Sequence, residues 1–203
     1  DTNRLKAMNS IAWDGYLFNQ PDSAFYFAQL LQDYALTVNN KTWLARALNI
    51  KGVSMSFKGK YSKSIDYFEK SLEIIENVEN KQLASVYTNI GVIYQQQGNY
   101  ERSLEYHKKS LEVCEKKGYK KGLASGYTNI GSIYNHQGNN EKALEYHQKG
   151  LEISMEIGDK RGMAAPYNNI GGIYNDQGNY ENALEYYAKC LEICEDIGDK
   201  TGT

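Results

Sequence analysis

Residues 87–94 read Tyr-Thr-Asn-Ile-Gly-Val-Ile-Tyr, and the pattern returns as Tyr-Thr-Asn-Ile-Gly-Ser-Ile-Tyr at 127–134 and as Tyr-Asn-Asn-Ile-Gly-Gly-Ile-Tyr at 167–174. Each copy begins 40 residues after the one before it. A fainter copy lies 39 residues upstream, where Gly52 matches Gly91. A fixed period of this length is typical of repeat architectures, so we expect a fold built from four copies of one unit.

Each repeat is predicted to form two helices. Apolar residues recur on one side of the first helix at about 100° per residue. Gly98 then supplies a left-handed helix end, and Asn99 supplies a side-chain oxygen that caps the next helix. The same Gly-Asn pair stands at 138–139 and 178–179. Asp159, which follows a closing Gly, is a candidate cap for the next first helix.

The organisation of the chain follows from these repeats. Residues 1–43 are predicted to form a diverged helical hairpin that caps the stack, with Pro21 opening its second helix. The four repeats are placed at 44–82, 83–122, 123–162 and 163–203. Ten helices in five antiparallel hairpins would each bury an apolar side against a neighbour. We therefore expect an all-α, right-handed superhelical solenoid.

Pro166 interrupts this regularity. It falls several residues after the Asp159 cap, where proline removes one helical hydrogen bond and clashes with the preceding turn. We expect a late helix start or a kink near Gly162–Pro166.

Composition excludes several classes of partner. The 203 residues contain 23 Lys+Arg against 25 Asp+Glu, a net charge of −2. Because a phosphate-binding surface needs a basic excess, no nucleic-acid partner is expected. No apolar run reaches the roughly 18 residues of a membrane-spanning helix, so no direct membrane insertion by these residues is expected.

The sequence gives no sign of catalysis. It has no Gly-x-Ser-x-Gly elbow, no phosphate-binding Gly-rich loop and no His-Glu-x-x-His, so we expect neither an enzyme nor a cofactor within these residues.

His107 and His147 share one repeat position, and Cys114 follows His107 on a similar face. A closed zinc site would need further ligands, so we interpret both histidines as core residues and expect no metal site. Cys190 and Cys194 are interpreted in the same way.

The pattern resembles the tetratricopeptide repeat, which has an aliphatic-Gly pair between aromatic residues in its first helix and a Gly-x-Tyr turn before its second. In the fourth copy the consensus places are filled by Tyr167, Ile170-Gly171, Tyr174, Gly178, Tyr180, Ala183, Tyr187 and Cys190-Leu191. The period is longer than the usual one of about 34 residues, and a Gly-Asp-Lys turn replaces the closing Pro. This form resembles the repeats of the kinesin light chain, of spindle-orientation scaffolds and, most of all, of bacterial sensor proteins.

The resemblance implies a protein-interaction module that binds a protein or peptide segment in its concave groove. It further implies the sensor or scaffold part of a longer signalling protein, with a histidine kinase or nucleotide cyclase as output. Residues 201–203 match the opening of another repeat, so we expect the chain to be a piece of something longer. Self-association and a peptide-responsive switch stay open as alternatives, and so do a cytoplasmic and a periplasmic location.

The groove is expected along the first helices, which line the concave side of such a solenoid. Their polar sides carry hydroxyls and amides, and Arg46 is almost the only cation, so no Lys and Arg cluster that grips a C-terminal carboxylate is expected. The candidate peptide-binding residues are Ser85, Thr88, Asn89, Gln96, Ser125, Thr128, Asn129, His136, Asn168, Asn169 and Asp176.

Three of these candidates recur at one repeat position, namely Asn89, Asn129 and Asn169. Each amide offers a donor and an acceptor, which suits the main chain of an extended peptide. We hypothesise an asparagine ladder along a bound segment. The alternative is that each Asn bonds the neighbouring repeat and only orders the stack. Ile50 takes the equivalent place in the first repeat, where the ladder would end.

Overall fold

The computed structural model describes residues 2–17, 19–75 and 81–198. Over these ranges the chain forms ten α-helices and one π-helical segment, with no strand, which confirms the all-α prediction. The chain divides into two compact units at Gln97 and Gly98, and each unit is described by itself. Within the described ranges, none of the helices combines the length and apolar character that crossing a membrane requires.

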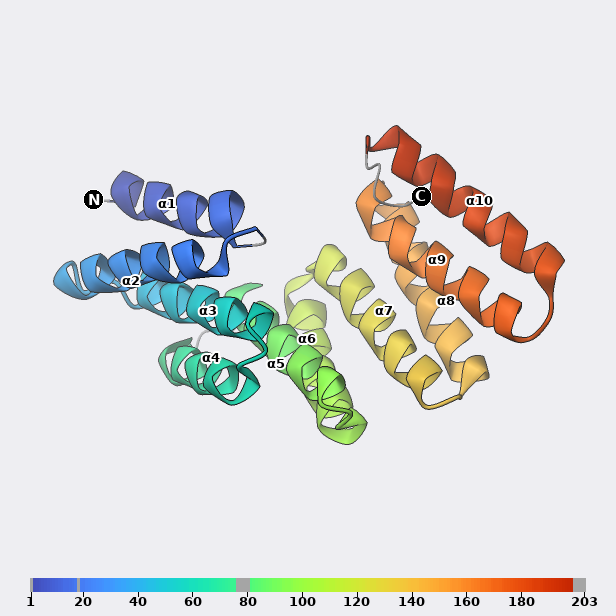
Figure 1. Cartoon of the computed structure of the whole chain (residues 1–203), viewed down its shortest axis with the longest axis horizontal. Helices are drawn as coiled ribbons and strands as arrows, with labels where there is room; N and C mark the ends of the chain where they lie inside the picture. Colours follow the sequence, from blue (N-terminus) through green and yellow to red (C-terminus); the bar gives the residue numbers. More distant parts are fainter. Residues whose placement is uncertain (1, 18, 76–80, 199–203) are drawn as a thin grey trace. The chain divides into compact units, whose positions relative to one another are not determined.

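Unit 1 holds the diverged hairpin, the first repeat and the first helix of the second repeat. Its elements are α1 (Thr2–Ser10), the π segment η1 (Ile11–Tyr16), α2 (Pro21–Thr37), α3 (Lys41–Phe57), α4 (Tyr61–Ile75) and α5 (Lys81–Gln96) (Figure 1). As predicted, Pro21 opens α2, where its fixed φ and missing N–H cost nothing. Asn40 caps α3 by accepting a hydrogen bond from the Trp43 backbone N–H at 3.2 Å.

The core of unit 1 joins the diverged hairpin to α3. Its buried residues are Leu5, Ala12, Leu17, Ala24, Ala28, Leu31, Ala35, Ala47 and Ile50. Five of them are alanines, which let helices approach closely. Ala12 and Leu17 are both fully buried although they lie five residues apart, a spacing that fits the wider π turn of η1 rather than an α turn. The π turn therefore sets which side chains of this segment enter the core.

Lys51 is an unusual member of the first repeat. It occupies the place of Ile90 in the next repeat and is 2% exposed. Its Nζ donates to the side-chain oxygens of Gln29 and Gln32 and lies 5.2 Å from the Phe25 ring. Burial lowers the pKa of the amine, which the Asp33 charge partly offsets. A charge thus stands where the other repeats bury an isoleucine.

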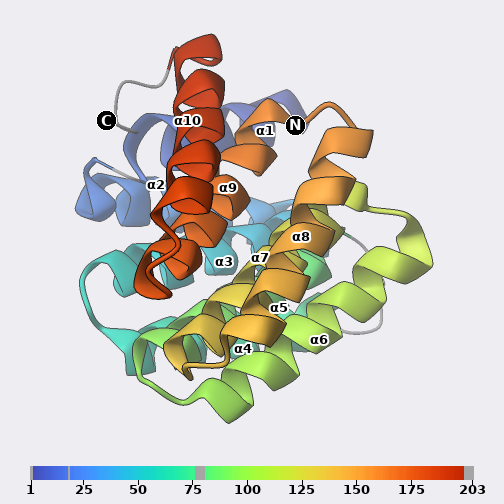
Figure 2. The same ribbon diagram turned by 90° about the vertical axis from the view of Figure 1, so that its right-hand side faces the viewer.

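Unit 2 holds the remaining helices as two complete hairpins after α6. Its elements are α6 (Tyr100–Lys117), α7 (Lys120–His136), α8 (Asn140–Glu156), α9 (Lys160–Asp176) and α10 (Tyr180–Asp196). Figure 2 shows α7 beside α8 and α9 beside α10.

The predicted turns before the second helices are confirmed. Gly98, Gly138 and Gly178 have φ of 73°, 73° and 74°, a left-handed conformation that glycine adopts without strain. The Asn after each Gly caps the next helix: Asn139, for example, accepts from the Lys142 backbone N–H at 3.1 Å. Asn99 and Asn179 accept the same bond at 3.2 and 3.3 Å. Sequence therefore sets both the helix end and the helix start locally.

The Gly of each aliphatic-Gly pair lets the two helices of a hairpin pack closely. A methyl group at Gly131 would lie 2.8 Å from the His147 ring, and one at Gly171 would lie 2.8 Å from the Tyr187 ring. Only glycine leaves room for these aromatic rings against the first helix. His147 is fully buried in this place, and so is His107 on α6, as the interpretation of both as core residues predicts.

Two predictions near the start of α9 are wrong. The helix begins at Lys160 and runs through Pro166, so the predicted late start is wrong, while a kink at Pro166 stays a prediction. Pro166 is buried inside the helix. Asp159 precedes the helix but makes no capping hydrogen bond. Its carboxylate instead pairs with Lys121 Nζ at 3.3 Å.

Candidate functional site

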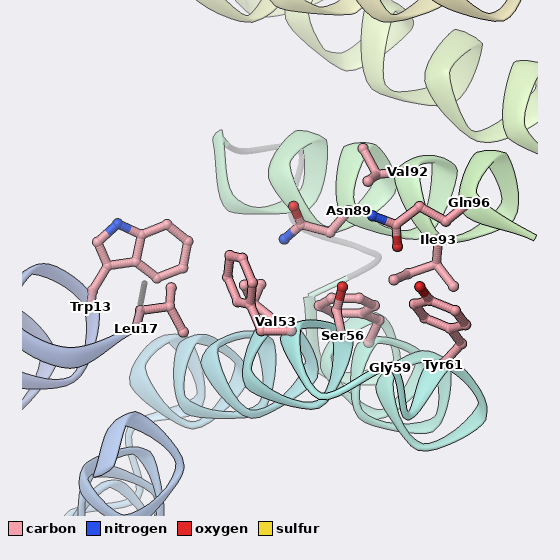
Figure 3. Close-up of a pocket in the computed structure, with 12 residues that line it drawn as sticks. Trp13, Leu17, Val53, Ser56, Gly59, Tyr61, Asn89, Val92, Ile93 and Gln96 are labelled. Atoms are coloured by element: carbon pink, nitrogen blue, oxygen red, sulfur yellow. The ribbon is translucent and has the colours of Figure 1, made fainter. Parts of the chain in front are cut away.

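Unit 1 contains an apolar pocket of about 660 Å³ (Figure 3). It is lined by Trp13, Leu17, Val53, Ser56, Phe57, Gly59, Tyr61, Phe68, Asn89, Val92, Ile93 and Gln96. These residues come from η1, α3, the turn after α3, α4 and α5. Concave pockets of this size that combine apolar walls with a few polar groups are typical binding sites. We call this set the apolar pocket.

The walls of the apolar pocket follow from local structure. The π segment η1 presents Trp13 to one end of it, next to the buried Leu17. Val53 and Ser56 follow one another by three residues on α3 and so share a face of that helix. Phe57 is 52% exposed at the end of α3, which leaves apolar surface open to a partner. Large aromatic walls on rigid helices offer contact area at low entropic cost.

Two amides from α5 provide the polar groups of the apolar pocket. Asn89 and Gln96 project from α5 toward α3 (Figure 3). The Asn89 Nδ2 donates to Asn49 Oδ1 on α3 at 2.9 Å, which fixes the orientation of the amide. The Asn89 Oδ1 therefore has a defined direction as an acceptor, whereas Gln96 is exposed and adaptable.

A second, smaller hollow of about 260 Å³ adjoins the apolar pocket and shares Trp13 with it. We call it the Arg46 hollow, and its lining residues are Trp13, Arg46, Asn49, Lys81, Gln82 and Ser85. The half-buried Arg46 donates from Nε to Asn9 Oδ1 and lies 5.9 Å from the Trp43 ring. Burial lowers the pKa of its guanidinium, and the Asp14 charge partly offsets this.

The candidate residues of unit 1 lie mainly at these two sites. Asn89 and Gln96 line the apolar pocket, and Ser85 lines the Arg46 hollow. Thr88 is half-buried on α5 and lines neither.

The candidates of unit 2 lie on α7 and α9, and several have local partners. Ser125 and Thr128 donate to carbonyl oxygens four residues earlier, at 3.0 and 2.9 Å. Asn169 Nδ2 donates to Ser132 Oγ on α7 at 3.4 Å. The His136 ring stacks on Tyr100, with ring centres 6.0 Å apart. Two of the three asparagines of the ladder, Asn89 and Asn169, thus have hydrogen bonds to a preceding repeat.

The remaining candidates of unit 2 are available to solvent. Asn129 is half-buried on α7, while Asn168 and Asp176 are exposed on α9. The pockets described above do not include them.

Sequence reasoning missed most of the residues that line the two sites, among them Trp13, Leu17 and Lys81. Trp13 and Leu17 belong to the diverged hairpin, which has no repeat pattern to place its side chains. Lys81 precedes the predicted start of the second-repeat pattern and reaches Arg46 only through packing of α5 on α3. The large aromatics of the first 43 residues were the one signal available.

The two core histidines are the main titratable groups in the interior of unit 2. Both ring nitrogens of His107 and of His147 are buried without a hydrogen-bond partner. Loss of hydration lowers the pKa of each imidazole to about 4. In the described ranges, no group of three or more His, Cys, Asp or Glu residues is arranged to hold a metal ion.

The hairpins, their turns and the Gly-aromatic packing define a helical-repeat protein. The family model of the tetratricopeptide repeat matches residues 43–116, 82–156 and 122–196, so the chain belongs to that family. Members of this family are in general non-catalytic modules for protein–protein interaction and scaffolding. Among proteins of curated function, none matches the sequence significantly.

Solved structures share the fold at low identity. The chain is similar to BtubC (BKLC) from P. vanneervenii, with 17% identity, 97% of this chain and 89% of that chain covered, and a TM-score of 0.70. It is similar to the MamA protein, with 17% identity, coverage of 99% and 97%, and a TM-score of 0.57. A third similarity is to a STAND signal-transduction ATPase with a tetratricopeptide repeat sensor from Pyrococcus horikoshii, with 20% identity, coverage of 95% and 30%, and a TM-score of 0.74. These similarities show the all-α repeat fold.

Proposed function

We propose that this chain is an interaction module whose unit 1 binds a segment of a partner protein in the apolar pocket. The observation that carries the proposal is the pocket itself, about 660 Å³ with apolar walls from four elements and two amides on α5. A Leu or Phe side chain of the partner would lie between Trp13 and Ile93. Burial of one such side chain contributes about 1.5–3 kcal/mol.

The amides of Asn89 and Gln96 would form hydrogen bonds with the main chain of the same partner segment. Asn89 is already oriented by Asn49, so it can accept from a peptide N–H without losing rotational freedom. In unit 2, considered by itself, we propose that Asn129 and Asn168 contact the main chain of a bound segment in the same way. In this role the repeats would be the sensor or scaffold part of a signalling protein.

A peptide-display selection on the immobilised chain tests the proposal. Selected peptides are titrated by fluorescence anisotropy against the parent and against Ser56→Arg, which places a long side chain in the apolar pocket. The matched control is Ser62→Arg on the exposed face of α4. We expect Ser56→Arg to weaken binding at least tenfold and Ser62→Arg to leave it unchanged. Equal binding by both variants, with unchanged thermal melts, would refute the pocket as the site.

The asparagine ladder is tested in the same assay. A triple variant with Asn89, Asn129 and Asn169 replaced by Ala should bind the selected peptides more weakly if the amides contact the ligand. An unchanged affinity at unchanged stability would assign them to ordering of the stack.

Self-association is a second candidate function, and one observation favours it. Leu184 and Leu191 on α10 are 69% and 38% exposed, whereas Leu111 and Leu151, which match Leu191 in earlier repeats, are 8% and 3% exposed. A second copy that covers this apolar face of α10 would form a dimer. The mass in solution should then rise with concentration, and Leu184→Asp should abolish the rise. A concentration-independent monomer that still binds peptide contradicts this function.

A peptide-responsive switch is the third candidate function, and it requires the dimensions of the chain to change when the peptide binds. Small-angle scattering with and without a saturating selected peptide measures this directly. Identical curves contradict it.

A further inference from the structure

We propose that the Arg46 hollow binds the side-chain carboxylate of an acidic residue in the partner segment whose apolar side chain enters the apolar pocket. The inference rests on the proposed function and specifies the chemistry of its partner. It assigns a role to two cations, Arg46 and Lys81, that the apolar pocket does not use.

The charge of the hollow is unbalanced. Its lining includes Arg46 and Lys81 but no acidic residue. In the part of the chain that the structure describes, Arg46 forms no ion pair, and Asp14 acts on it only as a nearby charge. A half-buried cation loses hydration without gaining a carboxylate, which is an unfavourable state that an acidic ligand would relieve.

The guanidinium is also held in place. Its Nε donates to Asn9 Oδ1, and the group lies 5.9 Å from the Trp43 ring. The planar fork of the remaining N–H donors matches a carboxylate, which it can bind through two parallel hydrogen bonds. A fixed Arg loses less entropy on binding than a free surface Lys.

The two hollows meet at Trp13, so one short segment can reach both. Asn49 and Ser85 also line the Arg46 hollow, beside the cations. Amide and hydroxyl groups suit main-chain amides on either side of an internal residue. We therefore assign the carboxylate to an internal Asp or Glu side chain rather than to a chain end.

The test uses sets of hexapeptides that are acetylated at the N-terminus and amidated at the C-terminus. Each set fixes one position as Leu and a second as Glu, Gln or Lys, and binding is measured by fluorescence anisotropy. At low salt we expect the best Glu set to bind about fivefold to tenfold more tightly than its Gln counterpart. The preference should shrink at high salt because partly exposed charges are screened.

Variants of the two cations test whether they cause the preference for Glu over Gln. Arg46→Gln and Lys81→Gln should each lower the ratio of Glu to Gln affinity toward one while the preference for Leu is retained. Lys63→Gln makes the same charge change on the exposed face of α4 and should leave the ratio unchanged. Lys81 is exposed, so its variant keeps the test valid even if Arg46→Gln is destabilised.

The outcomes separate this inference from the proposed function. Binding with a Leu preference but equal Glu and Gln affinities overturns the carboxylate site and leaves the apolar pocket standing. If a Gln peptide with a free C-terminal carboxylate binds as tightly as the Glu set, the assignment of the carboxylate to an internal Asp or Glu is overturned. No binding by any set overturns both proposals.

Discussion

Acidification should weaken unit 2 through its two buried histidines. Burial lowers the pKa of His107 and of His147 from 6.5 to about 4. The unfolded chain, with ordinary imidazoles, therefore takes up protons between about pH 6.5 and pH 4 that the folded chain does not. Stability is fully present above pH 6.5, falls as the pH drops through this window, and changes no further from these groups below pH 4.

The size of the loss follows from the pKa difference. A shift of 2.5 units is worth about 3 kcal/mol for each histidine once the pH is below 4. Carboxylates titrate in the same range, so the parent alone does not isolate the effect. Phe68 and Tyr187 hold the same repeat position without a titratable imidazole, and they supply natural replacements.

The assay is urea unfolding of the parent and of the double variant His107→Phe and His147→Tyr at pH 7 and pH 4.5. We expect the parent to lose several kcal/mol more than the double variant between these two values. Proton NMR titration of the two imidazoles in the folded chain gives the second readout. Equal losses in parent and variant, or folded-state pKa values near 6.5, would refute the reasoning.

Three further changes test the packing. Lys51→Ile restores the residue of the other repeats and should raise the free energy of unfolding by about 1 kcal/mol, because a buried charge is removed; a loss in urea unfolding would contradict this. Gly131→Ala should cost about 1–3 kcal/mol, since its methyl group would lie 2.8 Å from the His147 ring, and an unchanged melting temperature would count against the packing. Asn139→Ala should cost about 1 kcal/mol by loss of its capping bond, as measured by thermal melting beside Asn139→Asp, which keeps an acceptor and should lose less.

Local chemistry made much of the fold predictable. Gly138 and Asn139 end one helix and start the next through their own backbone and side-chain preferences, and the copies at the other turns do the same. The wrong predictions concern positions where contacts with other parts of the chain outweigh the local preference of the residue. Asp159 has the right side chain for a cap, yet a lysine from α7 holds its carboxylate. Pro166 disfavours a helix locally, yet it is buried within an uninterrupted one.

The candidate site was predictable only in part. Asn89 was found because it repeats, and the structure places it in the apolar pocket. Trp13 lies on a π segment, and the spacing of that turn gives no periodic signal in the sequence. Arg46 and Lys81 line one hollow only because α5 packs on α3, and the sequence does not show which helices pack together.

The central claim is that unit 1 binds a partner segment between η1, α3 and α5, and residue-resolved NMR tests it most directly. A selected peptide is added to the isotopically labelled chain, and shifts are followed at the Trp13 indole and at the Val53 and Val92 amides. We predict the largest changes at these three positions, with the amides of α10 unmoved. Changes centred on α7 and α9, with the Trp13 signal unchanged at saturation, would contradict the account.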